Sequence, residues 1–184
     1  ARVGVCGFSA GGHAALLYAV SWRQPWLSEA AGGAAELLRP ALCIAGYPVV
    51  DYMAWTDAQC PHPVTRQVRD ECRMGLFGVA DPDPALLEAT NPVLQVTADT
   101  PPMFLWATAE DVKVPAANTL HMAEALMQAG VPVEVHIFES GQHGLALASP
   151  ASAGTRQKLN PAAAQWLPLC ETWLQKRFEL ELME

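Results

Sequence analysis

The sequence lacks the features that mark membrane, nucleic-acid-binding and exported proteins. No apolar run approaches the roughly 20 residues that a membrane-spanning helix needs, and no leader with a long apolar core is visible. Lysine and arginine number 11 against 19 aspartates and glutamates, which gives a net charge of −8. Because phosphate backbones and anionic lipids attract clustered basic residues, we expect neither nucleic acid nor membrane as a partner.

Paired cysteines are also missing, since the five cysteines are odd in number and include no C-x-x-C motif. Cys6 and Cys43 lie inside apolar runs, where we expect buried free thiols. Cys60 and Cys72 flank a polar stretch and would pair only in an oxidising compartment. This cysteine usage makes a reduced, cytoplasmic protein the default expectation.

What the sequence does contain is an alternation of apolar runs and helical patterns. Hydrophobic residues make up 51% of the 184 positions, enough for one well-buried domain. The runs predict strands at 3–8, 41–47, 103–107 and 133–138, and the helical patterns cover 10–23, 115–129 and 161–178. Strands that alternate with helices indicate an α/β fold, with a parallel sheet of about four strands flanked by helices.

Residues 51–100 interrupt this alternation. The segment is rich in proline, with "CPHP", "DPDP" and "NP", and shows no clean periodicity. We interpret it as a cap-like insertion of turns and short helices within a single domain that spans 1–184.

A serine stands between glycines directly after the first predicted strand. The stretch "GFSAG", from Gly7 to Gly11, matches the G-x-S-x-G turn that exposes a nucleophile between a strand and a helix. The turn is strained, and we expect side chains two residues before and two residues after Ser9 to collide, so that glycine is needed at both places. The helix that follows would point the backbone N–H of Ala10 toward a developing oxyanion.

Partners for this serine follow two later strands. A serine hydroxyl needs a base, and the base needs an orienting carboxylate. Glu110 and Asp111 come just after the third predicted strand, and His143 lies in a glycine-flanked loop after the fourth. Carboxyl ends of parallel strands share one edge of a sheet, and the order Ser, acid, His fits the serine hydrolases built on such a turn.

Four other histidines compete with His143 less well. We expect His13 to pack locally one turn into the first helix, His121 to lie on a helix, and His136 to lie within a strand. His62 stands between two prolines and is a candidate for substrate contact.

With these segments in place, the chain resembles the α/β-hydrolase superfamily. Within it, the sequence is similar to bacterial acetyl and feruloyl esterases that act on carbohydrates such as xylan. The resemblance rests on "GVCGFSAGGH" at 4–13, on "GYPVVD" at 46–51 and on the long run 100–147.

The resemblance implies a Ser-His-Asp triad acting on an ester with a small acyl group, without metal or organic cofactor. Ser9 would be the nucleophile and His143 the base. Asp111, four residues before Pro115 as in many such hydrolases, would be the orienting acid, with Glu110 the less favoured alternative. The expected substrate is a small-molecule or oligosaccharide ester.

The sequence also departs from this family. Its members carry four strands before the serine turn and a His-Gly-Gly-type loop that supplies a second oxyanion donor, and no such loop is present here. We therefore expect residues 1–184 to form the C-terminal part of an α/β-hydrolase domain, with the first strand, 3–8, corresponding to the family's fifth. One edge of this strand would be open to association with another chain or with the missing N-terminal part. The N–H of Ala10 would be the remaining donor, and the 184 residues alone would be poorly active.

Two other functions stay open. A peptidase of the prolyl-oligopeptidase kind shares the turn and the triad order, although such enzymes usually have tyrosine where Ala10 stands. A non-catalytic remnant of a hydrolase is the third hypothesis. For an esterase, Tyr52 and Trp55 are candidates for a sugar-binding platform, whereas Trp106, inside a strand, is expected in the core.

Overall fold

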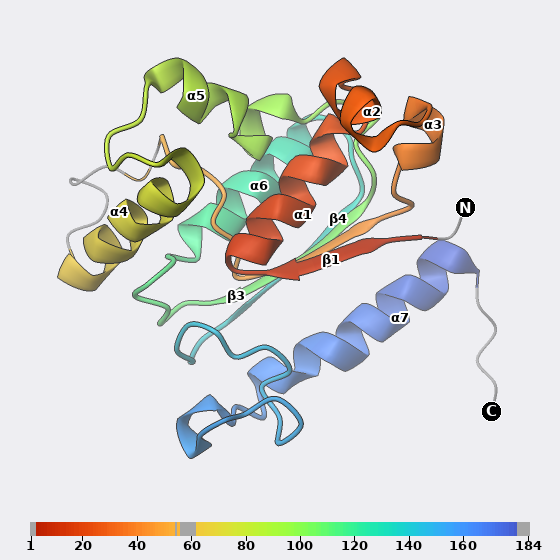
Figure 1. Ribbon diagram of the computed structural model, residues 1–184. Helices are drawn as coiled ribbons and strands as arrows, with labels where there is room; N and C mark the ends of the chain where they lie inside the picture. Colours follow the sequence, from red (N-terminus) through yellow and green to blue (C-terminus); the bar gives the residue numbers. More distant parts are fainter. Residues whose placement is uncertain (1–2, 54, 56–61, 180–184) are drawn as a thin grey trace.

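The sheet of the molecule has four parallel strands in the order β1-β2-β3-β4, so each crossover leads to the next neighbour (Figure 1). The computed structural model describes residues 3–53, 55 and 62–179. The strands are β1 (Val5–Phe8), β2 (Cys43–Gly46), β3 (Met103–Thr108) and β4 (Val133–Phe138). The α/β class and the four predicted strands are therefore confirmed, with the first two shorter than the apolar runs.

Helices cover both faces of this sheet (Figure 1). The long ones are α1 (Ala10–Ser21), α6 (Ala117–Gln128) and α7 (Trp166–Phe178). Met103 and Leu105 of β3 pack against α1 and α6, whereas Phe104 and Trp106 pack against α7. Successive side chains of a strand point to opposite faces, so β3 supplies both cores, and the expectation that Trp106 is a core residue is confirmed.

Short elements make up the connections. Helices α2 (Pro25–Ala31) and α3 (Ala35–Leu38) join α1 to β2, and the short 3₁₀ turns η2 (Arg156–Lys158) and η3 (Ala163–Gln165) precede α7. The helix predicted over 161–178 thus begins with a 3₁₀ turn. Every helix in the described ranges is too short or too polar to cross a bilayer.

The segment 51–100 is more regular than its sequence suggests. It holds α4 (Pro63–Phe77), α5 (Pro84–Ala89) and the 3₁₀ turn η1 (Pro92–Gln95). Thr65, Val68 and Cys72 lie on one face of α4, and Val68 and Cys72 pack against the buried rings of Tyr52 and Trp55. The expectation of no clean periodicity is wrong for α4, because a threonine on the buried face hid the helical pattern. That this segment is an insertion stays a prediction.

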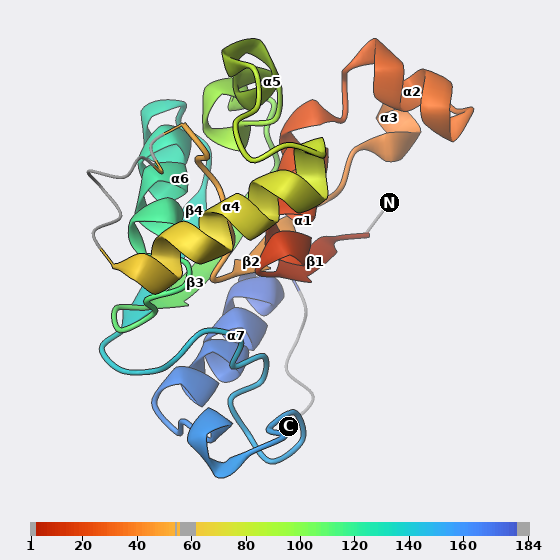
Figure 2. The same cartoon turned by 60° about the vertical axis from the view of Figure 1, so that its left-hand side comes forward.

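The helix α4 lies beyond the carboxyl ends of the strands, on the same side of the sheet as α1 (Figure 2). Gly78, with a φ of 75°, ends α4 through a backbone hydrogen bond to Met74. A left-handed residue of this kind favours glycine. The position of α4 puts this segment next to the edge where the candidate residues were expected.

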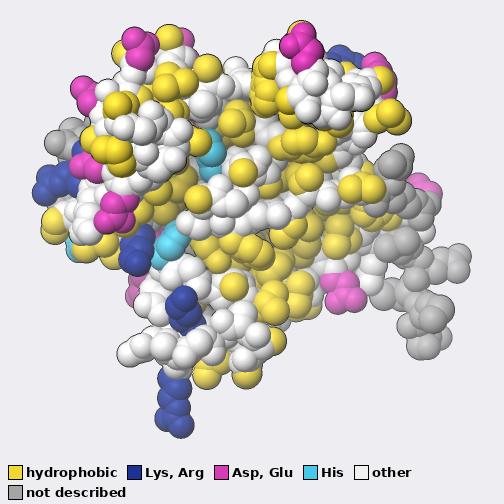
Figure 3. Space-filling view, in the orientation of Figure 1, with side chains coloured by type: hydrophobic (Ala, Val, Ile, Leu, Met, Phe, Trp, Pro, Cys, Tyr) yellow, Lys and Arg dark blue, Asp and Glu magenta, His cyan; other side chains and the backbone are white. Residues whose placement is uncertain are grey.

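Strand β1 forms one edge of the sheet, and within the described residues it pairs with β2 alone. Hydrophobic side chains gather on the surface over β1 and α7 (Figure 3). Cys6 is exposed on this strand, so its predicted burial is wrong, because among the described residues the strand has no neighbour on one side. Cys43 on β2 is buried and free, as predicted, and Cys72 is free. Cys60, its suggested partner, lies outside the described residues.

Candidate active site

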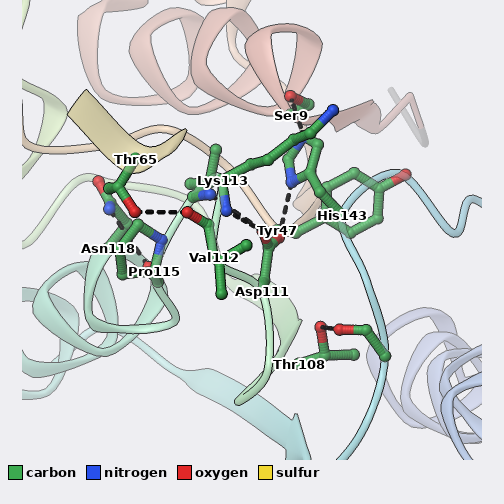
Figure 4. Close-up of polar contacts among 12 residues, drawn as sticks. Ser9, Tyr47, Thr65, Thr108, Asp111, Val112, Lys113, Pro115, Asn118 and His143 are labelled. Carbon is green, nitrogen blue, oxygen red and sulfur yellow. Dashed lines mark hydrogen bonds and ion pairs between the residues drawn. The ribbon is translucent and has the colours of Figure 1, made fainter. Parts of the chain in front are cut away.

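Three side chains that are far apart in the sequence meet at the carboxyl edge of the sheet (Figure 4). Ser9 follows β1, Asp111 follows β3 and His143 follows β4. The Oγ of Ser9 lies 2.8 Å from Nε2 of His143, and Nδ1 of His143 lies 2.6 Å from Oδ2 of Asp111. The structure thus joins the three residues that the sequence suggested, in the order hydroxyl, imidazole, carboxylate.

The hydrogen-bonding partners fix the tautomer of the imidazole. The carboxylate of Asp111 is an acceptor, so Nδ1 of His143 carries the proton and donates it. Nε2 then has the free lone pair and accepts from the hydroxyl of Ser9. The carboxylate is completely buried and the imidazole is 14% exposed, so the pair is shielded and the serine side stays reachable.

The turn that holds Ser9 is strained. Ser9 has a φ of 55°, which L-residues rarely adopt, and its N–H donates to the carbonyl of Gly46 over 3.0 Å. A Cβ on Gly7 would lie 2.0 Å from the carbonyl oxygen of Gly11, so glycine is required there. A Cβ on Gly11 meets nothing within 4 Å, and the predicted need for glycine is wrong at that position. The close approach belongs instead to Gly12, where a Cβ would lie 3.0 Å from Cβ of Pro48.

Helix α1 begins directly after the serine, at Ala10. The first N–H groups of a helix have no acceptor within it, and they carry the positive end of its dipole. The N–H of His13 already bonds to the carbonyl of Ser9 over 3.0 Å. Ala10 is the first residue of the helix, and the role of its N–H as an oxyanion donor stays a prediction.

A tight turn holds the carboxylate of Asp111. Its Oδ1 accepts from the N–H of Lys113 over 2.9 Å and from the N–H of Val114 over 3.0 Å, while Oδ2 faces His143. Both oxygens are therefore occupied. This orientation leaves the carboxylate little freedom to turn away from the imidazole.

The alternative acid, Glu110, has a different contact. Its Oε2 accepts from the N–H of Gly141 over 3.1 Å, and the hydroxyl of Thr108 donates to the carbonyl of Gly141 over 2.8 Å. Glu110 thus helps to tie the loop of His143 to the end of β3. The structure puts Asp111, and not Glu110, on the imidazole.

Helix α4 is tied to the loop of Asp111 (Figure 4). The hydroxyl of Thr65, in the first turn of α4, donates to the carbonyl of Val112. On the other side of the loop, the amide of Asn118 donates to the carbonyl of Pro115 over 3.2 Å. The loop is therefore held between α4 and α6.

Tyr47 contacts the histidine, and its place at the site was not predicted from the sequence. Its ring meets the His143 ring edge to face, with centroids 5.0 Å apart, and its Oη accepts from the N–H of Ala146 over 2.9 Å. Burial raises the pKa of the phenol, which keeps it neutral. A signal existed, because Tyr47 is the first residue after β2 at the edge where Ser9 was placed.

The residues suggested for substrate contact lie elsewhere than expected. Tyr52 and Trp55 are each 3% exposed. Their rings pack against Val49 and Val114, so neither presents the open face that a sugar ring would need, and the expected sugar platform is corrected; Tyr52 instead lines a cavity between α1 and α4. His62 is exposed and caps α4, with its Nδ1 accepting from a backbone N–H over 3.2 Å. Its contact with substrate stays a prediction.

The remaining histidines have local partners. Nδ1 of His13 donates to the carbonyl of Val49 over 3.2 Å, and burial lowers the pKa of this imidazole. His136 in β4 contacts Glu134 over 3.0 Å, as a strand residue can. Within the described part of the chain, no group of three or more His, Cys, Asp or Glu side chains has the geometry of a metal site.

The sequence and the fold of the chain are similar to those of known proteins. The BD-FAE family model matches residues 1–126. The carboxylesterase Cest-2923 from Lactobacillus plantarum superposes with a TM-score of 0.75 at 33% identity, over 98% of this chain and 60% of that one. The acetyl ester-xyloside bifunctional hydrolase from Caldicellulosiruptor lactoaceticus gives a TM-score of 0.73 at 31% identity, over 98% of this chain and 58% of that one.

A longer relative is also similar. Endo-1,4-beta-xylanase B of Butyrivibrio fibrisolvens is 32% identical over 150 residues, which are 79% of this chain and 21% of that protein. The chain thus spans about a fifth of this relative and less than two thirds of the two solved structures.

Proposed function

Because the chain belongs to the BD-FAE family of α/β-hydrolases, we propose that it hydrolyses carboxylic esters with Ser9 as the nucleophile. The single observation that carries the proposal is the continuous pair of hydrogen bonds from Ser9 through His143 to Asp111, at 2.8 and 2.6 Å. A hydroxyl, an imidazole and a buried carboxylate that are hydrogen-bonded in this order are the components of serine-dependent acyl transfer.

The reaction begins with attack of Ser9 Oγ on the ester carbonyl carbon. Nε2 of His143 takes the serine proton as the new C–O bond forms, and the carbonyl electrons move to the oxygen. The imidazolium is stabilised by Asp111, whose geometry leaves Nδ1 protonated throughout. When the intermediate collapses, Nε2 returns the proton to the alcohol, which leaves, and Ser9 remains acylated.

Water completes the cycle. It attacks the acyl group, His143 takes its proton, and the acid departs as the proton returns to Ser9. In both halves the negative oxygen needs donors that are already oriented. The N–H of Ala10, at the positive end of α1, is the donor that we assign to it.

The proposed substrate is a short-acyl ester of a carbohydrate, the acetyl ester being the simplest. Two relatives support this class by their names, the acetyl ester-xyloside bifunctional hydrolase and the xylanase. A small-molecule or oligosaccharide ester would approach the exposed side of His143, because the histidine must reach the alcohol oxygen.

The test is covalent labelling followed by turnover. A fluorophosphonate probe should label Ser9, which peptide mapping identifies, and Ser9→Ala should abolish labelling while His143→Ala slows it at least a hundredfold. Hydrolysis is then measured with p-nitrophenyl acetate and acetylated xylan oligosaccharides. A proline-linked anilide cleaved in preference to the esters would favour a peptidase, and a folded chain whose Ser9 does not react would contradict the proposal.

A further inference from the structure

A cavity of about 270 Å³ opens between the first turn of α1 and the second half of α4. Figure 2 shows the two helices at this place, with α4 passing in front of α1. The cavity begins at Ala10, the residue after the candidate nucleophile, and extends to Gly75 and Leu76 on α4. One end of the cavity therefore lies at the residue that follows the candidate nucleophile.

The walls of this cavity are largely apolar. They include the rings of His13 and Tyr52, which meet edge to face, and the thiol of Cys72. His13 uses Nδ1 to bind a backbone carbonyl, and its Nε2 is buried without a hydrogen-bond partner. None of the described side chains that line the cavity carries a full charge, so it favours an uncharged, apolar group.

Reaction geometry says which part of an ester points into this cavity. The carbon of the tetrahedral intermediate carries four groups: Ser9 Oγ, the oxyanion, the alcohol oxygen and the acyl substituent. His143 must return its proton to the alcohol oxygen, so the alcohol lies on the side of the histidine. The oxyanion faces Ala10, and the acyl substituent points away from His143. No residue from the loops of Asp111 or His143 lines the cavity.

We propose that the cavity between α1 and α4 binds the acyl group of the ester as a saturated chain longer than acetyl, and that Gly75 limits its length. This inference rests on the proposed esterase function and specifies its acyl group. The volume of 270 Å³ is about nine times the roughly 30 Å³ that one water molecule occupies in the liquid. An acetyl methyl would leave most of the cavity unfilled, whereas a butyryl or hexanoyl chain would enter it.

The first test measures acyl-chain preference. Each buried methylene should raise kcat/KM about fourfold, so p-nitrophenyl butyrate and hexanoate should exceed the acetate. Gly75 has ordinary helical backbone, and a Cβ there meets nothing within 4 Å. Gly75→Leu should therefore fold and lower the hexanoate-to-acetate ratio of kcat/KM at least tenfold.

A neighbouring residue on α4 supplies the control. Met74 is 52% exposed and does not line the cavity, so Met74→Leu should leave the ratio unchanged. A folded Gly75→Leu variant that hydrolyses hexanoate and acetate in the original ratio overturns the inference while leaving the esterase proposal intact.

The second test needs no turnover. Cys72 lines the cavity, and the exposed Cys6 on β1 is a reference thiol in the same chain. Hexanoate, the product acid, should slow alkylation of Cys72 by N-ethylmaleimide at least threefold without affecting Cys6, and acetate should slow neither. If Cys72 is alkylated at the same rate with and without hexanoate, the inference is overturned. Protection of Cys72 in a chain whose Ser9 is inert would reject the esterase and retain the acyl-chain site.

Discussion

Asp111 Oδ2 lies 2.6 Å from His143 Nδ1, and this contact joins the loops that follow two paired strands. Strands β3 and β4 run parallel, with Thr108 opposite Phe138 at their carboxyl ends. Asp111 comes three residues after its strand and His143 five residues after its own. Because both loops leave the same edge of the sheet, a few residues in each are sufficient to bring the acid and the base together.

Replacement of Asp111 by asparagine should disturb the orientation of the His143 imidazole without preventing the protein from folding. The amide keeps the size of the carboxylate but leaves His143 without its anionic acceptor, so kcat should fall by about 10⁴-fold while the protein stays folded. The measurement is ester hydrolysis with a thermal unfolding curve. Glu110→Gln is the control, because Glu110 contacts only the backbone of Gly141 in the described contacts and should cost less than tenfold. A fall of less than tenfold for Asp111→Asn would contradict the assigned role.

The two glycines of the serine turn should respond in opposite ways. Gly7→Ala drives a Cβ to 2.0 Å from the carbonyl of Gly11 and should destabilise the protein by about 3 kcal/mol or prevent folding. Gly11→Ala adds a methyl in open space on α1 and should be neutral or stabilising by up to about 1 kcal/mol. The free energy of unfolding of both variants is measured in urea. Equal losses in the two would show that the turn is not as tight as described.

Tyr47→Phe should weaken catalysis by loosening the histidine. The ring would still contact His143, but the N–H of Ala146 would lose its acceptor, at a cost of about 1–3 kcal/mol. We expect Ser9 to react about tenfold more slowly with the fluorophosphonate, measured where the variant is fully folded.

Tyr18→Phe is the matched control for this tyrosine. Tyr18 donates one hydrogen bond to the carbonyl of Leu38 over 2.6 Å, between α1 and the end of α3. Its loss should reduce stability without changing the labelling rate. If the two variants label at the same rate, Tyr47 does not position His143.

Buried His13 should make stability depend on pH. Burial lowers its pKa below the ordinary 6.5, so below that pH the unfolded chain binds a proton that the native state resists. Stability should therefore be complete above about pH 6.5 and fall as the pH drops toward the lowered native pKa, by up to about 1.4 kcal/mol per pH unit.

The pH dependence of the wild type is compared with that of His13→Gln, because glutamine does not bind a proton in this pH range. Between about pH 7.5 and pH 5, its unfolding free energy in urea should fall less steeply than that of the wild type. Identical slopes for the wild type and His13→Gln would contradict the buried, neutral state of His13.

Much of the fold and of the candidate site was readable from the sequence. The apolar runs gave the strands, and the alternation with helices gave a parallel sheet, because such crossovers put successive carboxyl ends at one edge. Ser9, Asp111 and His143 each follow a strand by a few residues, so their meeting depended only on this topology. The family match over residues 1–126 confirms the resemblance to α/β-hydrolases.

The features that could not be predicted from the sequence depend on packing between distant segments. Whether Trp55 is a sugar-binding residue or a core residue depends on the packing of α4 against it. The buried face of α4 could not be recognised in the sequence because it includes the polar residue Thr65. The bond between Tyr47 and Ala146 joins residues 99 positions apart, and no local pattern encodes it. Gly11 and Gly12 look alike in sequence, and only the position of Pro48 distinguishes them.

The outermost position of β1 has a consequence for the nucleophile. Among the described residues, Ser9 is attached to the rest of the sheet through one ladder of hydrogen bonds, that with β2. Edge ladders are among the first to open in local fluctuations. Transient fraying of β1 would carry the hydroxyl away from the imidazole while the His143–Asp111 pair stays closed, so slower amide exchange along β1 should accompany faster chemistry at Ser9.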